Sequence, residues 1–463
     1  MSPLARTVRP KSSSRMMRPV VENLEGRLLM YATTPNKFAY GYGITFSIVP
    51  DGTVLGNQTS NLYATMDKNY GVNVWEHFVF DAAAMWESNA NINLVYVADN
   101  GAPIGSGPYQ QGNPAFGDIR IGGFTQDHYT MAFSFQPPPA NGGSLSGDIF
   151  MNTALPWGGP DGYDLETSLV HEFGHSLGLA HSTDRNAAMY STYTGYKIFP
   201  NQDDINGIQA MWGQRWVDNI TQANANFTMD HAANVNPYMN PQNNQIAIQN
   251  LDIAKRGDAF WFKVTTPPNA STTLAAVVQS YNLSLLSPKV QIFDANGNGL
   301  AQNTAWLWNY GDFAATQITN ATPNTTYYIR ALASSNEVTG VGAYALFVNM
   351  GSGILTAFPR AYTVVATQPD QGGGTWGQTA PTPTAKQAPG TNDDFVQFGN
   401  AVVPGDKFSI APALLNKPTP VVVPTKQHHS VPVAVHTKQH HPTHWAYSKQ
   451  FTGSGKHHSA VSA

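Results

Sequence analysis

The stretch that decides the fold is residues 171–181, which read HEFGHSLGLAH. Apolar side chains recur with helical spacing before and within this stretch, at Leu165, Leu169, Phe173 and Leu177. This spacing is typical of an amphipathic helix with one buried face. Asp164 stands just before the run, and aspartate is one of the residue types that cap helix N-termini. The sequence therefore predicts a helix that follows Asp164 and carries the first two histidines of the stretch.

Three histidines in this stretch form a candidate metal site. His171 and His175 lie one helical turn apart, so both imidazoles can reach one ion. Gly178 can adopt backbone conformations that other residues resist, so the chain can turn there and return His181 as a third ligand. Three neutral nitrogen ligands leave the fourth tetrahedral position open for water. This arrangement predicts one catalytic zinc ion rather than a structural one.

Glu172 lies beside the first predicted ligand and has no metal role by its spacing. Its carboxylate can take a proton from a water that zinc has acidified and later pass that proton to a leaving amine. The reaction that suits this arrangement best is hydrolysis of a peptide bond. The simpler alternative for residues 171–175 alone is a pair of exposed histidines on a helix.

The extension to Gly178 and His181 resembles the metzincin zinc-protease signature. Met189, in the sequence AAMY at 187–190, stands where the matrixin branch places its Met-turn. Residues 202–213, which read QDDINGIQAMWG, are similar to the closing helix of the matrix metalloproteinase catalytic domain. The resemblance covers about residues 33–213. It implies an α+β domain with a mixed sheet and long helices.

The resemblance also implies roles for residues outside the histidine stretch. Met189 would lie beneath the zinc as an apolar floor, and Asp204 would accept hydrogen bonds from the Met-turn backbone. Met131 and Ala132 match the edge strand along which a substrate lies and adds its own backbone to the sheet. Tyr193 would form part of the wall of the pocket for the substrate residue after the cut bond.

Two departures from the family concern further metals. Phe133 and Phe150 stand where the family has histidines of a structural zinc, and a phenyl ring offers no lone pair to a metal. Asn152 and Leu155 stand where it has the Asp and Glu of a calcium site. We therefore expect no second zinc and leave calcium open.

Hydrophobic patterns divide the rest of the chain. Up to residue 135 they predict a mixed sheet and one long helix: strands within 37–50, 91–98, 116–123 and 131–135, and a helix over 75–86. From residue 216 to 350 they predict an antiparallel β-sandwich. The prediction rests on about 100 residues that show no helix and six strands, at 260–264, 273–278, 290–293, 314–318, 326–331 and 343–348.

Residues 216–350 resemble the bacterial pre-peptidase C-terminal domain, an accessory module of secreted peptidases without catalytic residues. The resemblance rests on four short segments, at 258–264, 293–297, 327–329 and 342–346. It does not indicate which ligand this region binds.

Both ends of the chain differ from the middle. Residues 1–31 carry six basic and two acidic side chains, and LEGRLL at 24–29 resembles a motif (Leu-Glu-x-Arg-x-Leu-Leu) ahead of exported bacterial proteins. We interpret residues 1–31 as a processed or disordered leader. The alternative is an unstructured start without an export signal.

The C-terminal part of the chain is rich in proline and histidine. Residues 351–463 hold 12 of the 32 prolines and eight of the 14 histidines. This composition predicts a disordered tail rather than a metal-capturing one.

Composition excludes several classes of protein. The net charge is -4 and only 12% of residues are charged, so no basic field points to nucleic acid. No apolar run approaches the roughly 18 residues that a bilayer span needs. The chain has no cysteine, which excludes disulfides, cysteine-ligated metals, thiol nucleophiles and latency controlled by a cysteine.

We therefore expect a secreted, extracellular and bacterial zinc metalloendopeptidase of the matrixin type, with residues 32–215 as its catalytic domain and a protein or peptide as its substrate. Two alternatives stay open. One is a surface-binding or adhesive protein with a vestigial protease site, which the intact Glu172 disfavours. The other is a zinc hydrolase with a non-peptide substrate, which the predicted edge strand disfavours.

Overall fold

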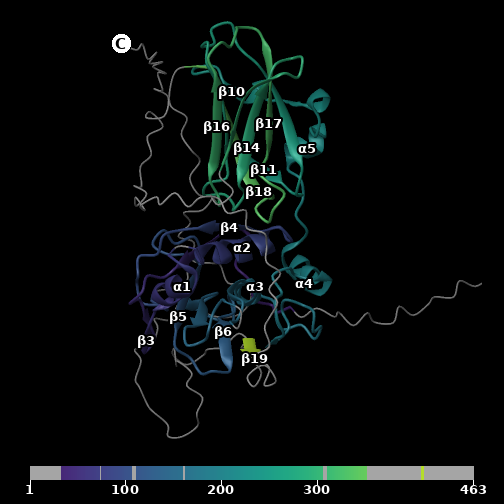
Figure 1. The fold of residues 1–463 in the computed structure, drawn as a ribbon. Helices are drawn as coiled ribbons and strands as arrows, with labels where there is room; N and C mark the ends of the chain where they lie inside the picture. Colours follow the sequence, from purple (N-terminus) through teal and green to yellow (C-terminus); the bar gives the residue numbers. More distant parts are fainter. Residues whose placement is uncertain are drawn as a thin grey trace, which may run out of the picture.

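The computed structural model describes residues 33–351, apart from 73, 107–110, 160–161 and 306–309, together with the backbone of residues 408–410. Two units are visible in Figure 1: an N-terminal unit of helices around a sheet, and a C-terminal unit made mostly of strands. The predicted leader lies outside the described residues. No helix in the described part of the chain is long and apolar enough to cross a membrane.

The N-terminal unit is built on a mixed sheet of seven strands in the order β4-β1-β5-β7-β6-β19-β8. The strands are β1 (Tyr42–Ile48), β4 (Asn93–Tyr96), β5 (Ile119–Phe124), β6 (Thr130–Ser134), β7 (Ile149–Asn152), β8 (Thr192–Tyr193) and β19 (Phe408–Ile410). β4, β1, β5 and β7 run parallel, and β6 is antiparallel to β7. A separate two-stranded sheet joins β2 (Val54–Leu55) to β3 (Gln58–Thr59). The predicted mixed sheet is confirmed.

Four α-helices and one 3-10 helix complete this unit: α1 (Leu62–Tyr70), α2 (Glu76–Glu87), η1 (Gly143–Leu145), α3 (Leu165–Ser176) and α4 (Gln202–Trp212). The helix predicted after Asp164 is α3, and the Asp164 side chain accepts a hydrogen bond from the Thr167 N–H at 2.7 Å. All twelve residues of α3 are buried. On one side it packs on α2, where Trp86 Nε1 donates to the Val170 carbonyl at 2.8 Å. The sequence patterns did not predict α1.

The C-terminal unit contains two five-stranded sheets, in the orders β10-β11-β18-β13-β16 and β15-β14-β17-β12-β9. The strands are β9 (Ala233–Asn234), β10 (Met239–Asn240), β11 (Gln245–Ile253), β12 (Ala259–Thr265), β13 (Leu274–Gln279), β14 (Pro288–Phe293), β15 (Gly299–Thr304), β16 (Phe313–Ile318), β17 (Thr326–Ala333) and β18 (Gly342–Asn349). Both sheets contribute to one apolar core, with Phe260 and Phe262 from one sheet and Leu346 and Val348 from the other. All six predicted strands are present.

Before the first predicted strand, the structure has three short helices that the sequence patterns did not predict. The structure has α5 (Asn219–Asn224), η2 (Met229–His231) and η3 (Asn236–Tyr238) there. Asp218 caps α5 by accepting hydrogen bonds from the N–H groups of Ile220 and Thr221, both at 2.9 Å. This short helix has no long apolar stripe, so hydrophobic periodicity could not reveal it.

The predicted disordered tail is also corrected at one point. Phe408–Ile410 form β19, which pairs antiparallel with β6 and parallel with β8. Figure 1 shows this strand beside β6, at the end of the N-terminal unit that lies away from the two-sheet unit. The strand depends on edges that other parts of the chain supply, and composition carries no information about such edges. The rest of 352–463 lies outside the described residues.

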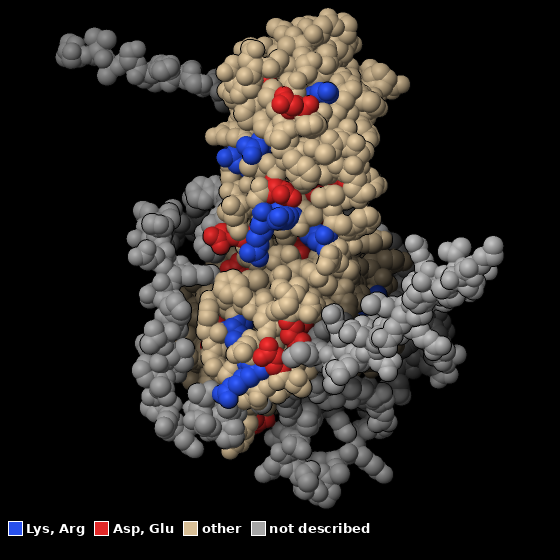
Figure 2. All heavy atoms as spheres, turned by 90° about the vertical axis from the view of Figure 1, so that its right-hand side faces the viewer, with Lys and Arg blue, Asp and Glu red and all other residues tan. Residues whose placement is uncertain are grey.

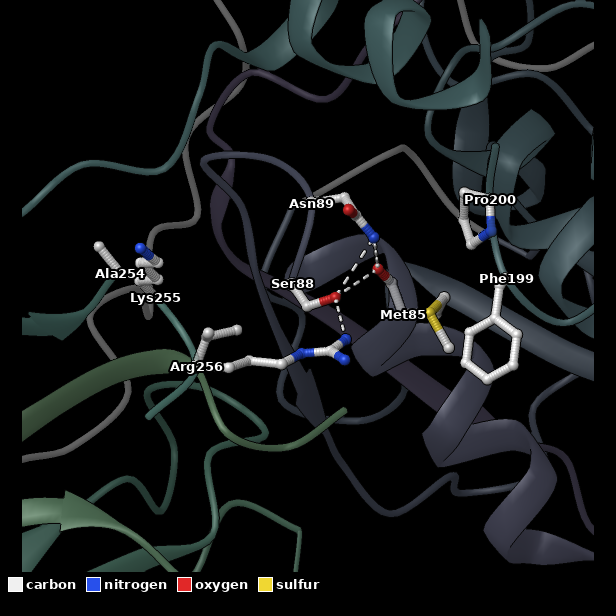
Figure 3. A pocket seen from close by; sticks show the side chains of 9 residues that line it. Met85, Ser88, Asn89, Phe199, Pro200, Ala254, Lys255 and Arg256 are labelled. Carbon is white, nitrogen blue, oxygen red and sulfur yellow. Dashed lines mark hydrogen bonds between the residues drawn. The ribbon is translucent and has the colours of Figure 1, made fainter. Parts of the chain in front are cut away.

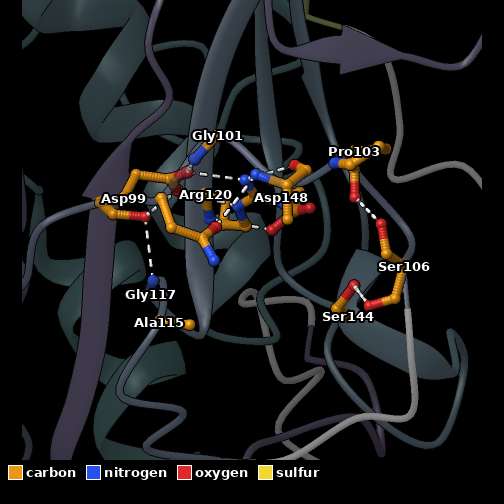
Figure 4. A network of polar contacts seen from close by, with 12 residues as sticks. Asp99, Gly101, Pro103, Ser106, Ala115, Gly117, Arg120, Ser144 and Asp148 are labelled. Atoms are coloured by element: carbon orange, nitrogen blue, oxygen red, sulfur yellow. Dashed lines mark hydrogen bonds and ion pairs between the residues drawn. The ribbon is translucent and has the colours of Figure 1, made fainter.

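A buried ion pair stabilises the central sheet. Arg120 of β5 is fully buried and donates from Nε and Nη2 to the two carboxylate oxygens of Asp99, at 2.8 and 2.7 Å (Figure 4). Asp148 accepts a hydrogen bond from the Arg120 backbone N–H at 2.8 Å, and burial raises the pKa of the Asp148 carboxyl well above its usual range.

Charged side chains are sparse on the surface, and most of the described surface in Figure 2 is uncharged.

The two units meet mainly along α2. Tyr310 donates from its hydroxyl to Asp81 at 3.0 Å and stacks on Phe80, with ring centroids 4.7 Å apart. The Leu285 N–H donates to the Glu87 carboxylate at 3.2 Å. Burial raises the pKa of Glu87 to about 8, although the nearby Arg215 charge acts in the opposite direction.

Arg215 connects the units at the predicted domain boundary. Its side chain is only 3% exposed and forms an ion pair with Asp252 of β11, with Nε 3.1 Å from the carboxylate. Nη1 donates to the Ile92 carbonyl at 2.7 Å, and Nη2 donates to Asn93 Oδ1. One guanidinium therefore bonds to both units.

Replacement of Arg215 tests this interface. We expect Arg215→Ala to lower the free energy of unfolding by about 3–5 kcal/mol, because it leaves the Asp252 carboxylate without its buried partner. Arg256→Ala is the matched control, since Arg256 is exposed and reaches Ser88 Oγ across the boundary with one hydrogen bond of 3.0 Å (Figure 3). The control should cost less than about 1 kcal/mol. Equal losses in urea unfolding would contradict the role given to Arg215.

Candidate metal centre

The structure brings the three predicted ligands together. His171, His175 and His181 each offer one ring nitrogen, and these atoms lie within 4.8 Å of one another. The Nε2 atoms of His171 and His175 are 3.1 Å apart. In the described part of the chain, these three histidines form the one group of at least three His, Cys, Asp or Glu side chains that could hold a metal ion.

Backbone carbonyls fix the ring tautomers of the two helical histidines. Nδ1 of His171 lies 2.7 Å from the Ala188 oxygen, and Nδ1 of His175 lies 2.8 Å from the Leu179 oxygen. A carbonyl only accepts, so each Nδ1 must carry the proton. Each Nε2 then has a lone pair directed at the space that the imidazoles share.

This geometry fits a zinc ion. Two Nε2 lone pairs 3.1 Å apart repel each other unless a cation lies between them. A tetrahedral zinc with Zn–N bonds of about 2.0–2.1 Å holds its ligand nitrogens about 3.3 Å apart. Burial and the neighbouring imidazoles lower the pKa of His171 well below its usual value, and burial lowers the pKa of His181 to about 4. The rings of His171 and His181 are therefore neutral at physiological pH, the state in which imidazole ligates metals.

The turn at Gly178 returns His181 to the helix. Gly178 has φ +101°, and its N–H donates to the His175 carbonyl at 2.9 Å. A Cβ at this position would lie 2.2 Å from the Asn36 oxygen and 2.3 Å from Met211 Cε. Only glycine satisfies both the backbone conformation and the close approach.

Glu172 is placed to handle a proton beside the histidines. It is fully buried, and its Oε2 accepts a hydrogen bond from Ser134 Oγ at 2.7 Å. Its Oε1 has no hydrogen-bond partner among the described residues. Burial raises the pKa of Glu172 to about 8, and the hydrogen bond from Ser134 opposes this shift.

Asp204 bonds to the backbone at Met189, whose place beneath a zinc ion stays a prediction. Asp204 accepts hydrogen bonds from the N–H groups of Ala188 at 2.7 Å and Met189 at 3.0 Å. Met189 is buried, and a Cβ on Gly174 of α3 would lie 2.3 Å from its sulfur. This close packing places Met189 against the helix turn that carries His175.

The predicted substrate-binding residues occupy two strands. Met131 and Ala132 are fully buried in β6, whereas Tyr193 is in β8. The Tyr193 side chain is 3% exposed, and its hydroxyl accepts from the Asp164 N–H at 3.2 Å. Tyr193 therefore supports the N-terminus of α3, and its predicted place in a pocket wall stays a prediction.

The positions that depart from the family are filled by other contacts. The rings of Phe133 and Phe150 lie 5.2 Å apart and pack with Phe124 and Phe135. The Asn152 amide donates to the carbonyls of Asp127 and Thr130, both at 2.7 Å. Leu155 is buried in the core. The number of zinc and calcium ions stays a prediction.

Sequence reasoning missed Ser134 and the carbonyls of Leu179 and Ala188. Ser134 lies two residues after Ala132, so the period of two places both side chains on one face of the strand. This signal was available in the sequence. The two carbonyls carried no signal, because every residue has one.

Replacement of Gly178 tests the turn that positions His181. Gly195→Ala is the matched control, because Gly195 has φ +112° and its Cβ would meet no atom within 4 Å. The control should cost about 1–2 kcal/mol of backbone strain. We expect Gly178→Ala to cost at least ~2 kcal/mol more, since its Cβ overlaps a backbone oxygen. Urea unfolding measures both, and equal costs would refute the close approach.

Comparison with protein families identifies a catalytic domain. The family model described as Matrixin matches residues 60–213. Matrix metalloproteinase-20 of Homo sapiens is 46% identical over 92 residues, which are 19% of this chain and 18% of that protein. Neutrophil collagenase of Homo sapiens is 34% identical over 143 residues, or 30% of this chain and 28% of that protein. Karilysin of Tannerella forsythia is 31% identical over 144 residues, with the same shares of 30% and 28%.

The chain thus spans less than a third of the length of each of these relatives. The matched region nevertheless includes α1 to α4, all three histidines, Glu172 and Met189. One of these relatives is named a matrix metalloproteinase and another a collagenase. Residues 60–213 are a matrixin domain.

Proposed function

We propose that this protein is a secreted zinc-dependent endopeptidase that hydrolyses peptide bonds in protein or peptide substrates. The observation that carries the proposal is the group of three imidazoles, two of them fully buried, with Glu172 next to His171 on α3. The matrixin match supports the same chemistry. We also propose that the protein is exported from a bacterial cell, because residues 24–29 resemble an export motif. These residues lie outside the described part of the chain.

His171, His175 and His181 would hold the zinc through one ring nitrogen each. When bound, zinc supplies Lewis acidity, which lowers the pKa of water and polarises a carbonyl. Glu172 accepts the water proton at Oε1, while the Ser134 hydroxyl holds Oε2 in place. The carboxylic acid formed then donates this proton to the leaving amine.

The substrate would bind as an added strand. β6 carries Ser134, whose contact with Glu172 places this strand beside the proposed general base. An extended peptide along β6 would bring its own carbonyls close to the histidines, because backbone pairing fixes the peptide at about 4.8 Å from the strand. Pairing of this kind favours a peptide over a non-peptide substrate. The ligand of the two-sheet unit is not indicated.

The alternative of an adhesive protein with a vestigial site is less well supported. Burial of a carboxyl group without full hydrogen bonding costs free energy. A vestigial site would gain nothing in return for this cost. Glu172 retains both its burial and its bond to Ser134. The intact pair therefore favours an active enzyme.

Replacement of Glu172 tests the proposed proton transfer. We expect Glu172→Ala to keep zinc and fold but to lower kcat/KM for peptide substrates by about 10³-fold, because the residue serves as both base and acid. Ser134→Ala should cost less than about tenfold, since it removes one hydrogen bond to the carboxylate. Turnover of Glu172→Ala within tenfold of the wild type would exclude Glu172 as the base.

A comparison of zinc contents tests the ligands. The eight tail histidines are the same in every variant, so any stray metal on them cancels and the difference between variants isolates the site. We expect His171→Ala to contain one zinc ion fewer per chain than the wild type, and chelation of this ion to abolish activity until zinc is restored. His231→Ala, at an exposed histidine of η2, is the matched control with unchanged zinc. Equal zinc in all three proteins would contradict the assignment.

A further inference from the structure

Strand β19 lies between β6, which the proposed function assigns to substrate, and β8, which carries Tyr193 of the predicted pocket wall. The sheet order is β6-β19-β8, although β6 and β8 belong to the matrixin domain and β19 comes from residues 408–410. Figure 1 shows β19 beside β6. Phe408 pairs with Ala132, and Ser409 pairs with Thr130 on the same strand. On its other side, Ser409 pairs with Thr192 and Ile410 with Tyr193.

We propose that the segment around Phe408–Ile410 is an intramolecular inhibitor that binds in the substrate position and competes with external peptides. This inference rests on the proposed function, because it takes the free edge of β6 as the place where substrate binds. It assigns the occupant to this chain itself.

The backbone pairing makes the competition direct. β6 pairs with β7 through one edge, and β19 takes the other edge. Among the described strands, β8 pairs with β19 alone. A strand has only two edges, so a peptide that adds to β6 must use the same N–H and C=O groups that β19 now uses. The segment and a substrate cannot both be bound.

The position of β19 also covers the proposed reaction centre. β19 contacts α3, the helix that carries His171, Glu172 and His175. Its partner β6 carries Ser134, which bonds to Glu172. A chain in this position therefore lies across the groups that would act on a peptide bond.

The tether explains how such a short pairing can be effective. Residues 352–407 connect the segment to the last strand of the two-sheet unit. Attachment to the same chain makes binding intramolecular, with effective concentrations that reach the millimolar range for suitable linkers. Three paired residues are weak by themselves, so a peptide with a longer pairing can displace them. The chain has no cysteine for a thiolate block, and this segment would restrain the enzyme instead.

A proline substitution tests the proposal in the full chain. Ser409→Pro removes a backbone N–H and fixes φ at a value that suits a central strand poorly. Ala434→Pro, elsewhere in the same tail, is the matched control. We expect Ser409→Pro to raise kcat/KM for a short peptide about tenfold, or ~1.4 kcal/mol, through a lower KM at unchanged kcat. The control should match the wild type, and a Ser409→Pro variant that also does so would overturn the proposal.

Hydrogen exchange gives a readout that does not need activity. The amides of Thr130–Ser134 should exchange faster in Ser409→Pro than in the wild type or Ala434→Pro, because the strand that covers the β6 edge is lost. Unchanged exchange would overturn the inference whatever the activity. Faster exchange without peptide hydrolysis by any variant would uphold the docking of the segment and refute the proposed function.

The fate of the segment separates an inhibitor from a substrate. After incubation of the wild-type chain with zinc, mass spectrometry should find residues 404–413 uncut. A synthetic peptide of these residues should inhibit Ser409→Pro competitively. A cut within 404–413 would show that the segment is a substrate and would overturn its assignment as an inhibitor.

Discussion

The site depends on two hydrogen bonds from imidazole Nδ1 atoms to backbone carbonyls, from His171 to Ala188 and from His175 to Leu179. Each bond fixes a tautomer and directs Nε2 to the shared centre. The acceptors are themselves held, because Asp204 accepts the Ala188 N–H and the Leu179 N–H donates to the Gly174 carbonyl at 2.9 Å. The ligand geometry is therefore determined by the backbone that follows α3 as well as by the helix.

Helix α2 links this site to the rest of the molecule. One of its faces packs on α3, where Trp86 bonds to Val170, and another carries the contacts of Asp81 and Glu87 with the two-sheet unit. Arg215 adds bonds to both units beside the end of α2. The two-sheet unit is thus fixed to the same helix that supports the histidines. A buried carboxyl such as Glu87 is tolerated there because backbone N–H groups from both units donate to it.

Much of this could be predicted from sequence because it follows from periodicity and local spacing. The helix after Asp164, the six predicted strands of residues 216–350 and the meeting of His171, His175 and His181 are of this kind. α5 is too short to show a periodic apolar stripe, and α1 was not recognised. β19 could not be predicted, because its pairing partners lie more than 200 residues away in the chain. Long-range backbone pairing leaves no mark on composition.

The most direct test of the account is the location of zinc in crystals of the full chain. Anomalous diffraction measured at the zinc absorption edge should give one strong peak within about 2.0–2.1 Å of the Nε2 atoms of His171 and His175 and of a ring nitrogen of His181. This result would establish the ligand set on which the proposed peptidase chemistry depends. A zinc-loaded crystal with no peak at these three histidines would contradict the central claim.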